Sequence, residues 1–298
     1  MLLYLQIMLA QLQKSREYFE SGATKSFAFR KQQLQLLAAA IKKYEAEIAG
    51  ALHTDLGKSY TEAYASEIAL VQMEISFFLK NLRQLMQPKL VDTNLMNLPA
   101  SSKMYYDPLG VVLIIAPWNY PFQLLFNPLV GAIAGGNCVV LKPSEFAPAT
   151  SAIMKKIIEA TFAGEYILYV EGDGATVIPE MMNNFSFDHV FYTGSTAVGK
   201  IIYKMAAEKL VPVTLELGGK SPCIVENDAN IKVAAKRIAL TSFSNAGQMC
   251  VAPDYILVHA EKKDEFITVL KNSLQQFYGV NPKEHENYGR IINEKQFD

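Results

Sequence analysis

Cys250 and Glu216 are the two side chains whose types and surroundings could do chemistry together. Cys250 follows Gly-Gln-Met at 247–249, and Glu216 lies in the segment Leu-Glu-Leu-Gly-Gly at 215–219. A thiol can attack a carbonyl carbon and hold the product as a thioester, and a carboxylate can activate the water that cleaves it. The loop position of Cys250 favours a functional role. The other cysteines, Cys138 and Cys223, lie in predicted strands and are expected to be packed apolar residues.

Asn119 lies in a loop that is stiffened by Pro117 and Pro121. An asparagine amide that is held rigidly in a dry site can stabilise a developing oxyanion. Asparagine is also a favoured N-cap residue, and spacing alone favours a cap on the helix that begins at Pro121.

Lys142 and Glu145 follow a second predicted strand. A lysine and a carboxylate at this spacing could bind the vicinal hydroxyls of a ribose. The carboxylate would then favour NAD, because it repels the 2′-phosphate of NADP. The alternative is an ordinary exposed loop with Ser144 as a helix cap.

Gly194 and Ser195 form a turn between a predicted strand and the N-terminus of a helix. The segment is neither G-x-G-x-x-G nor a Walker A loop. Free backbone N–H groups at a helix N-terminus still suit a phosphate. A simple N-cap at Ser195 or Thr196 is the alternative.

The elements that must position these residues are short apolar strands alternating with helices. Such a pattern predicts an α/β fold with a doubly wound, Rossmann-type parallel sheet, and ligands bind beyond the carboxyl ends of its strands. The predicted strands are 111–115, 138–141, 167–170 and 189–192, and the predicted helices are 121–134, 148–162 and 196–209.

The chain divides into four parts on this basis. Residues 1–89 form helices, 90–109 form an irregular connection or a hairpin, and 110–212 form a dinucleotide-binding domain. Residues 213–298 start a second α/β unit, which carries Cys250. Its predicted strands are 213–216, 223–225 and 255–258, and its predicted helices are 231–245 and 262–277.

Composition narrows the function classes. Half of the 298 residues are hydrophobic and the net charge is −1, which excludes a disordered chain and argues against a nucleic-acid or anionic-membrane partner. Three cysteines without C-x-x-C spacing fit a reducing, cytoplasmic location and give no zinc signature, so no metal is expected. No apolar run is long enough to span a membrane, and residues 1–10 read as an amphipathic first helix.

Five segments, taken in order, resemble the aldehyde dehydrogenase superfamily. They are Pro-Trp-Asn-Tyr-Pro, Lys-Pro-Ser-Glu, Phe-Tyr-Thr-Gly-Ser-Thr-Ala-Val-Gly, Leu-Glu-Leu-Gly-Gly-Lys-Ser-Pro and Gly-Gln-Met-Cys. Three further segments, 55–59, 212–216 and 288–292, are similar to the class 3, fatty-aldehyde-type branch.

The resemblance implies roles for the residues introduced above. Cys250 would be the nucleophile, Glu216 the general base, and Asn119 the oxyanion donor together with the backbone N–H of Cys250. Lys142 and Glu145 would bind the adenine ribose of the cofactor, and Gly194 and Ser195 would bind its pyrophosphate. Trp118 is also expected to contact the cofactor. The implied reaction is oxidation of an aldehyde to a carboxylic acid with NAD, or with NADP, in a homodimer.

Members of this superfamily are longer, so the chain resembles an N-terminal fragment that lacks the last third. Two other functions stay open at this point. One is a thiol-dependent ester or thioester hydrolase, which would use Cys250, Asn119 and Glu216 without a hydride acceptor. The other is an inactive nucleotide-binding remnant.

Overall fold

The structure, a computed structural model, describes residues 2–298, and the side chains from residue 5 onward. Its N-terminal part is helical, as predicted, and the predicted first helix is the start of α1; Met1 lies outside the described residues. The helices of this part are α1 (Leu2–Glu20), α2 (Phe27–Lys43), α3 (Glu45–Leu56), α4 (Tyr60–Ala63), the π-helical turn η1 (Tyr64–Ile68) and α5 (Ala69–Leu85).

Five parallel strands form the main sheet, in the order β5-β4-β3-β6-β7. The chain starts in the middle at β3, adds β4 and β5 on one side, and returns to add β6 and β7 on the other. The carboxyl ends of β3 and β6 therefore flank the point where the strand order reverses, which is where such sheets bind ligands. The strands are β3 (Val111–Ile115), β4 (Cys138–Lys142), β5 (Ile167–Tyr169), β6 (His189–Gly194) and β7 (Val213–Leu217).

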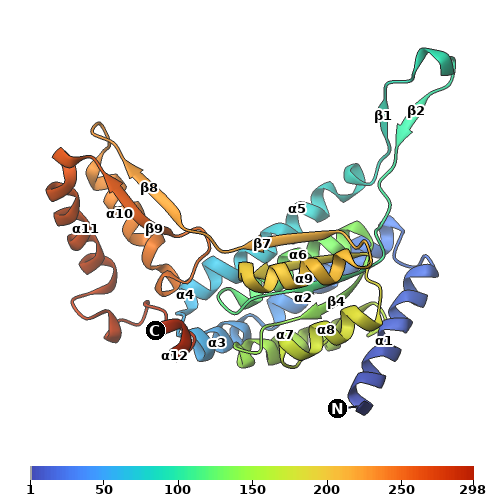
Figure 1. Cartoon of the computed structure of the whole chain (residues 1–298), viewed down its shortest axis with the longest axis horizontal. Helices are drawn as coiled ribbons and strands as arrows, with labels where there is room; N and C mark the ends of the chain where they lie inside the picture. The colour runs from blue at the N-terminus through green and yellow to red at the C-terminus, as the bar shows by residue number, and fades with distance from the viewer. Residues whose placement is uncertain (1) are drawn as a thin grey trace.

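Helices cover this sheet, which explains why every residue of β3 and β4 is buried. Helix α6 (Pro121–Gly135) contacts β3 and β4, α7 (Pro148–Thr161) contacts β5, and α9 (Thr196–Ala207) contacts β6 and β7. Helix α1 contacts β3, β4 and β5, while α2 and α5 pack on α6 as an outer layer (Figure 1). The sequence therefore predicted the doubly wound fold correctly.

Helix α8 (Gly174–Asn184) is a long helix that the sequence patterns did not predict. It opens at a glycine and carries Pro179 in its interior. Both residue types are unfavourable inside helices, so the local sequence argues against the element. Packing of the buried side chains Val177, Ile178, Met181 and Met182 outweighs that propensity.

A second, smaller sheet pairs β8 (Ser221–Val225) with β9 (Pro253–Val258) in parallel. Helix α10 (Ile231–Phe243) packs on β9 and on α11 (Lys263–Tyr278), and these elements lie to one side of the main sheet (Figure 1). The short terminal helix α12 (Glu294–Phe297) follows. The buried side chains of this smaller core are Val225, Ile231, Ala235, Ile238 and Phe266.

One predicted strand belongs to a different sheet from the one expected. Val213–Leu217 does not start the second unit together with β8. It pairs with β6, to which α9 connects it, and forms an edge strand of the main sheet. The register sets Glu216 opposite Thr193. This correction matters for the site, because it brings Glu216 to the strand ends where ligands bind.

The connection after α5 is a hairpin, which was one of the two predicted forms. Its strands β1 (Lys89–Val91) and β2 (Ser102–Met104) are antiparallel and project away from the body (Figure 1). None of the helices in the described part of the chain combines the length and the apolar character needed to cross a membrane.

Candidate active site

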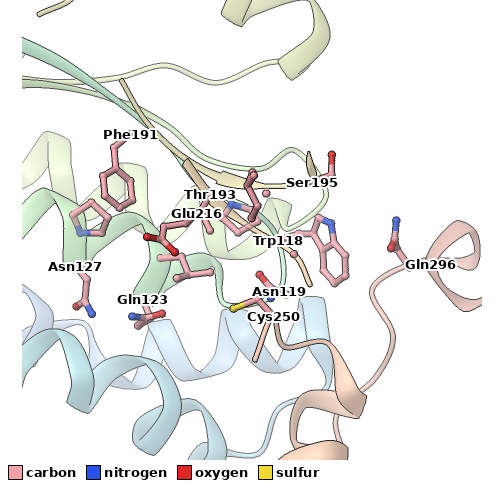
Figure 2. A pocket seen from close by; sticks show the side chains of 16 residues that line it. Trp118, Asn119, Gln123, Asn127, Phe191, Thr193, Ser195, Glu216, Cys250 and Gln296 are labelled. Atoms are coloured by element: carbon pink, nitrogen blue, oxygen red, sulfur yellow. The ribbon is translucent and has the colours of Figure 1, made fainter. Parts of the chain in front are cut away.

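A pocket of about 560 Å³ lies at the carboxyl ends of β3, β6 and β7 (Figure 2). It brings together six of the eight residues that the sequence analysis selected, from four separate segments of the chain. They are Trp118, Asn119, Gly194, Ser195, Glu216 and Cys250. Lys142 and Glu145 do not line it.

Cys250 is exposed, in contrast to the buried Cys138. It follows a turn, η3 (Ser244–Gly247), in which Asn245, Ala246 and Gly247 all have positive φ values of 51°, 54° and 79°. Two of these are not glycine, so the backbone conformation costs energy and needs support from outside the turn. Glu62 supplies part of it, since its Oε1 accepts a hydrogen bond of 2.7 Å from the Asn245 backbone N–H.

The Asn119 side chain does not cap α6, so the cap interpretation is wrong. Its Nδ2 donates to the Gln248 carbonyl at 3.0 Å, two residues before Cys250. In Figure 2 the Asn119 amide and the Cys250 thiol lie together at one end of the pocket. The Asn119 Oδ1 is buried and has no hydrogen-bond partner among the described residues.

Glu67 is the residue that caps α6. Its Oε2 accepts the backbone N–H groups of Phe122 and Gln123 at 2.9 and 3.1 Å. Its Oε1 accepts from Lys58 Nζ at 2.5 Å, and both side chains of this ion pair are fully buried. Sequence reasoning missed both residues as parts of the site; the Asp-Leu-Gly-Lys-Ser segment at 55–59 was the only signal.

That segment, which spans the end of α3 and the connection to α4, contacts several distant parts of the chain. The Asp55 carboxylate accepts the N–H groups of Ala149 and Thr150 at the start of α7, at 3.1 and 2.7 Å. The Leu56 carbonyl accepts the Arg290 backbone N–H at 2.6 Å. Lys58 Nζ donates to the Asn119 carbonyl at 3.1 Å.

Glu216 is exposed and lies at the penultimate position of β7. In Figure 2 its carboxylate faces the pocket at a distance from Cys250 along the same wall. Gly218 and Gly219 follow, and a Cβ at either position would meet no atom within 4 Å. Space for a ligand or for movement of Glu216 therefore lies beside this strand end.

Lys142 is the last residue of strand β4, and Glu145 lies in the loop just beyond it. Lys142 Nζ is buried and donates to the Pro143 carbonyl at 2.5 Å and to Glu145 Oε2 at 3.2 Å. Glu145 Oε1 accepts the Gly174 N–H at the start of α8, at 3.1 Å. The pair is thus fixed in place, and the lysine and the N-terminus of α8 both oppose the negative charge of Glu145.

Ser195 caps α9, as one of the two interpretations predicted, because its Oγ accepts the Val198 N–H at 3.3 Å. Ser195 and Gly194 also line the pocket, so the helix N-terminus opens into it. A Cβ on Gly194 would lie 2.3 Å from the Tyr192 hydroxyl oxygen. Only glycine therefore fits at this position without displacing the Tyr192 side chain.

Burial raises the pKa of two groups, Glu62 near the Cys250 loop and Cys138 at the amino end of the main sheet. Burial holds the pKa of the Glu62 carboxyl above its ordinary value, although the hydrogen bond from the Asn245 N–H and the charge of Lys58 lower it in part. Burial also raises the pKa of the Cys138 thiol to about 12. Within the described residues, no group of three His, Cys, Asp or Glu side chains is placed to hold a metal ion.

Comparison with known proteins identifies the family. The model of the Aldehyde dehydrogenase family matches residues 8–298, and the chain belongs to that family. It is 50% identical to 4,4′-diaponeurosporen-aldehyde dehydrogenase of Staphylococcus aureus, over 95% of this chain and 61% of that protein. It is 42% identical to aldehyde dehydrogenase family 3 member A2 of Macaca fascicularis, over 96% of this chain and 59% of that protein, in agreement with the class 3 resemblance.

Solved structures show the same fold. Substrate-bound AldH of Staphylococcus aureus has a TM-score of 0.92 at 50% identity, with 96% of this chain and 62% of that chain covered. Indole-3-acetaldehyde dehydrogenase AldA of P. syringae, solved with NAD⁺ and IAA, has a TM-score of 0.86 at 28% identity, with 96% and 58% covered. The chain spans about 60% of the length of the relatives it matches.

Proposed function

We propose that this chain carries the catalytic residues for NAD-dependent oxidation of an aldehyde to a carboxylic acid. The observation that carries the proposal is the meeting of Cys250, Asn119 and Glu216 in one pocket at the reversal point of a parallel sheet. A nucleophile, an oxyanion donor and a base are the three groups that formation and cleavage of a thioester need.

The residues around the pocket fit a dinucleotide. The N-terminus of α9 at Ser195 offers backbone N–H groups to a pyrophosphate, and Trp118 and Phe191 offer apolar faces to a flat ring. Asn119 Oδ1 and Asn127 Oδ1 are buried polar atoms in this wall without partners among the described residues. When bound, NAD supplies the hydride acceptor; related structures are described as NAD⁺ complexes.

The chain's own residues would perform the remaining chemistry. The Cys250 sulfur adds to the aldehyde carbon, and the carbonyl oxygen becomes an oxyanion beside the Asn119 amide. Loss of a hydride then leaves a thioester on Cys250. Glu216 takes a proton from the water that attacks this thioester, which releases the acid and restores the thiolate. The open space beside Gly218 lets the carboxylate approach from its position on β7.

A second cavity gives the aldehyde chain its approach. It measures about 460 Å³, and Tyr120, Leu240, Phe277 and Tyr278 line it together with polar side chains such as Glu62 and Ser244. Tyr120 follows Asn119 in the chain, so this cavity lies beside the loop that carries the proposed oxyanion donor. We infer that it receives an apolar aldehyde.

The test mixes the protein with an aliphatic aldehyde and NAD and follows the absorbance of the reduced nicotinamide. We expect a signal that Cys250→Ala abolishes and that Cys223→Ala, a change in strand β8, leaves in place. Equal rates in the two variants would exclude Cys250 as the nucleophile. Ester cleavage that depends on Cys250 and gains nothing from NAD would assign the chain to hydrolysis instead.

A further inference from the structure

We propose that Lys58 and Glu67 are positioning residues, which set the Asn119 amide against the Cys250 loop. The proposal rests on the proposed function, because it gives that reaction two further residues that touch no reacting atom. It arises from a fully buried ion pair directly beneath the Asn119 loop.

Lys58 contacts the Asn119 loop at two points. Its Nζ donates to the Asn119 carbonyl at 3.1 Å and lies 4.0 Å from the centre of the Tyr120 ring. The remaining strong contact of this ammonium group is the 2.5 Å hydrogen bond to Glu67. The two hydrogen bonds of Lys58 Nζ therefore go to the loop that carries the oxyanion donor and to the residue that caps α6.

Glu67 fixes the far side of the same loop. Its Oε2 accepts both N–H groups from the first turn of α6, at Phe122 and Gln123. The loop from Asn119 to Phe122 is thus held by Lys58 at its start and by Glu67 at its end. Two charged groups without water around them make stronger and more directional hydrogen bonds than neutral ones.

The position of the loop determines the position of the amide. The Asn119 carbonyl accepts from Lys58 and also from Asn245 Nδ2, at 2.7 Å, while Asn119 Nδ2 donates to the Gln248 carbonyl. The main chain and the side chain of Asn119 are therefore both anchored, and Lys58 is the charged anchor of the main chain. Loss of the Lys58 contact would leave the Asn119 carbonyl held by Asn245 alone and let the amide move relative to Cys250.

A buried ion pair is a poor device for stability alone. Apolar residues of similar size often replace such pairs at no cost, whereas removal of one partner leaves an unpaired buried charge. Here the ion pair contacts the Asn119 loop and not only apolar core side chains. A pair in this place can fix the conformation of the loop. The test must therefore distinguish an effect on the position of Asn119 from an effect on the stability of the fold.

The test variant is Lys58→Met combined with Glu67→Gln. It leaves no unpaired buried charge and retains an oxygen that can accept from the α6 N–H groups, so the fold is kept while the donor to the Asn119 carbonyl is lost. The matched control is Lys156→Met, which removes an exposed ion pair with Glu47. We expect the variant to lose about 100-fold in kcat/KM for the aldehyde, as a small misplacement of a catalytic group does, with an unchanged Kd for NAD.

Epistasis with Asn119→Ala distinguishes position from stability. If the pair acts through Asn119, adding the double substitution to Asn119→Ala causes no further loss in kcat/KM. Additive losses, or a double variant as active as Lys156→Met, would overturn the proposal.

An NMR measurement tests the positioning role without enzyme turnover. The side-chain NH₂ resonance of Asn119, assigned by its absence from Asn119→Ala, should shift and exchange faster with solvent in the double variant, and not in Lys156→Met. An unchanged resonance overturns the positioning role. A protein that oxidises no aldehyde but shows the shift would refute the proposed function and leave the positioning role supported.

Discussion

Asn119 and Gln248 are joined by a hydrogen bond of 3.0 Å from the Asn119 amide to the Gln248 carbonyl, across 129 positions of the chain. This bond links the loop after β3, in the main sheet, to the loop that carries Cys250. An amide NH₂ has two protons. One is used by Gln248, and the other is left for an oxygen that develops beside the thiol.

Asn119→Ala should reduce kcat/KM for the aldehyde by about 100- to 1000-fold, because it removes an oxyanion donor worth roughly 3–4 kcal/mol in comparable sites. Steady-state kinetics with NAD and an aliphatic aldehyde measure the loss. Asn184→Ala is the control, since Asn184 is exposed at the end of α8 and bonds only within that helix. Equal activity of the two variants would show that Asn119 donates to no oxyanion.

Glu216→Gln should slow release of the acid and spare its formation on Cys250. A neutral amide cannot take the proton of the attacking water, so the thioester should accumulate. Rapid mixing should show a burst of about one reduced cofactor per chain and then a slow steady state. Glu208→Gln, an exposed change just after α9, should show the parent's kinetics. If the burst disappears, Glu216 acts before acylation.

Alkylation rates should distinguish the exposed Cys250 from the buried Cys138. Cys250 is exposed, whereas burial raises the pKa of the Cys138 thiol to about 12, so Cys138 has little thiolate near neutral pH. Iodoacetamide at pH 8 should modify Cys250 at least 100-fold faster than Cys138, as read by mass spectrometry of peptides. Comparable rates would show that the main sheet opens on the timescale of the reaction.

The Glu62 carboxyl should make stability depend on pH. Burial raises its pKa in the folded protein above the ordinary value of 4.5, so the folded state retains a proton that the unfolded state has released. This contribution is fully present below pH 4.5 and is lost as the pH rises through the folded pKa. Glu62→Gln keeps an acceptor for the Asn245 N–H, so the variant should gain stability relative to the parent between pH 4 and pH 8. Urea unfolding at both pH values measures this gain, and a constant difference would contradict it.

Glu145→Gln should bring the preference for NAD over NADP closer to one. We expect a change of about 5- to 10-fold, which corresponds to roughly 1 kcal/mol between unit charges 4 Å apart in water. The contacts of Glu145 with Lys142 and with the α8 N-terminus limit the effect. The ratio of kcat/KM values for the two cofactors measures it. An unchanged ratio would place Glu145 away from the ribose.

The sequence predicted the strands well because each is a short apolar run between glycines, prolines or polar residues. The sequence did not predict which strand is the neighbour of another, because Val213–Leu217 has the same local pattern whether it pairs with β6 or with β8. Motifs also led to the pocket-lining residues, since loops at the strand ends converge by topology. The Lys58 contacts with Asn119 and Glu67 left no comparable pattern, because a buried ion pair depends on tertiary packing and has no spacing rule.

The segment 55–59, at the end of α3 and in the connection to α4, has a consequence for the order of folding. Asp55, Leu56 and Lys58 bond to α7, to Arg290 and to the Asn119 loop, so their partners lie up to the far end of the chain. Contacts of such long sequence separation form only after a large loss of chain entropy, and they slow folding. We therefore expect the pocket to acquire its final geometry in the last kinetic phase, after the main sheet has assembled. Early folding intermediates would then hold a complete sheet and a thiol that does not yet react.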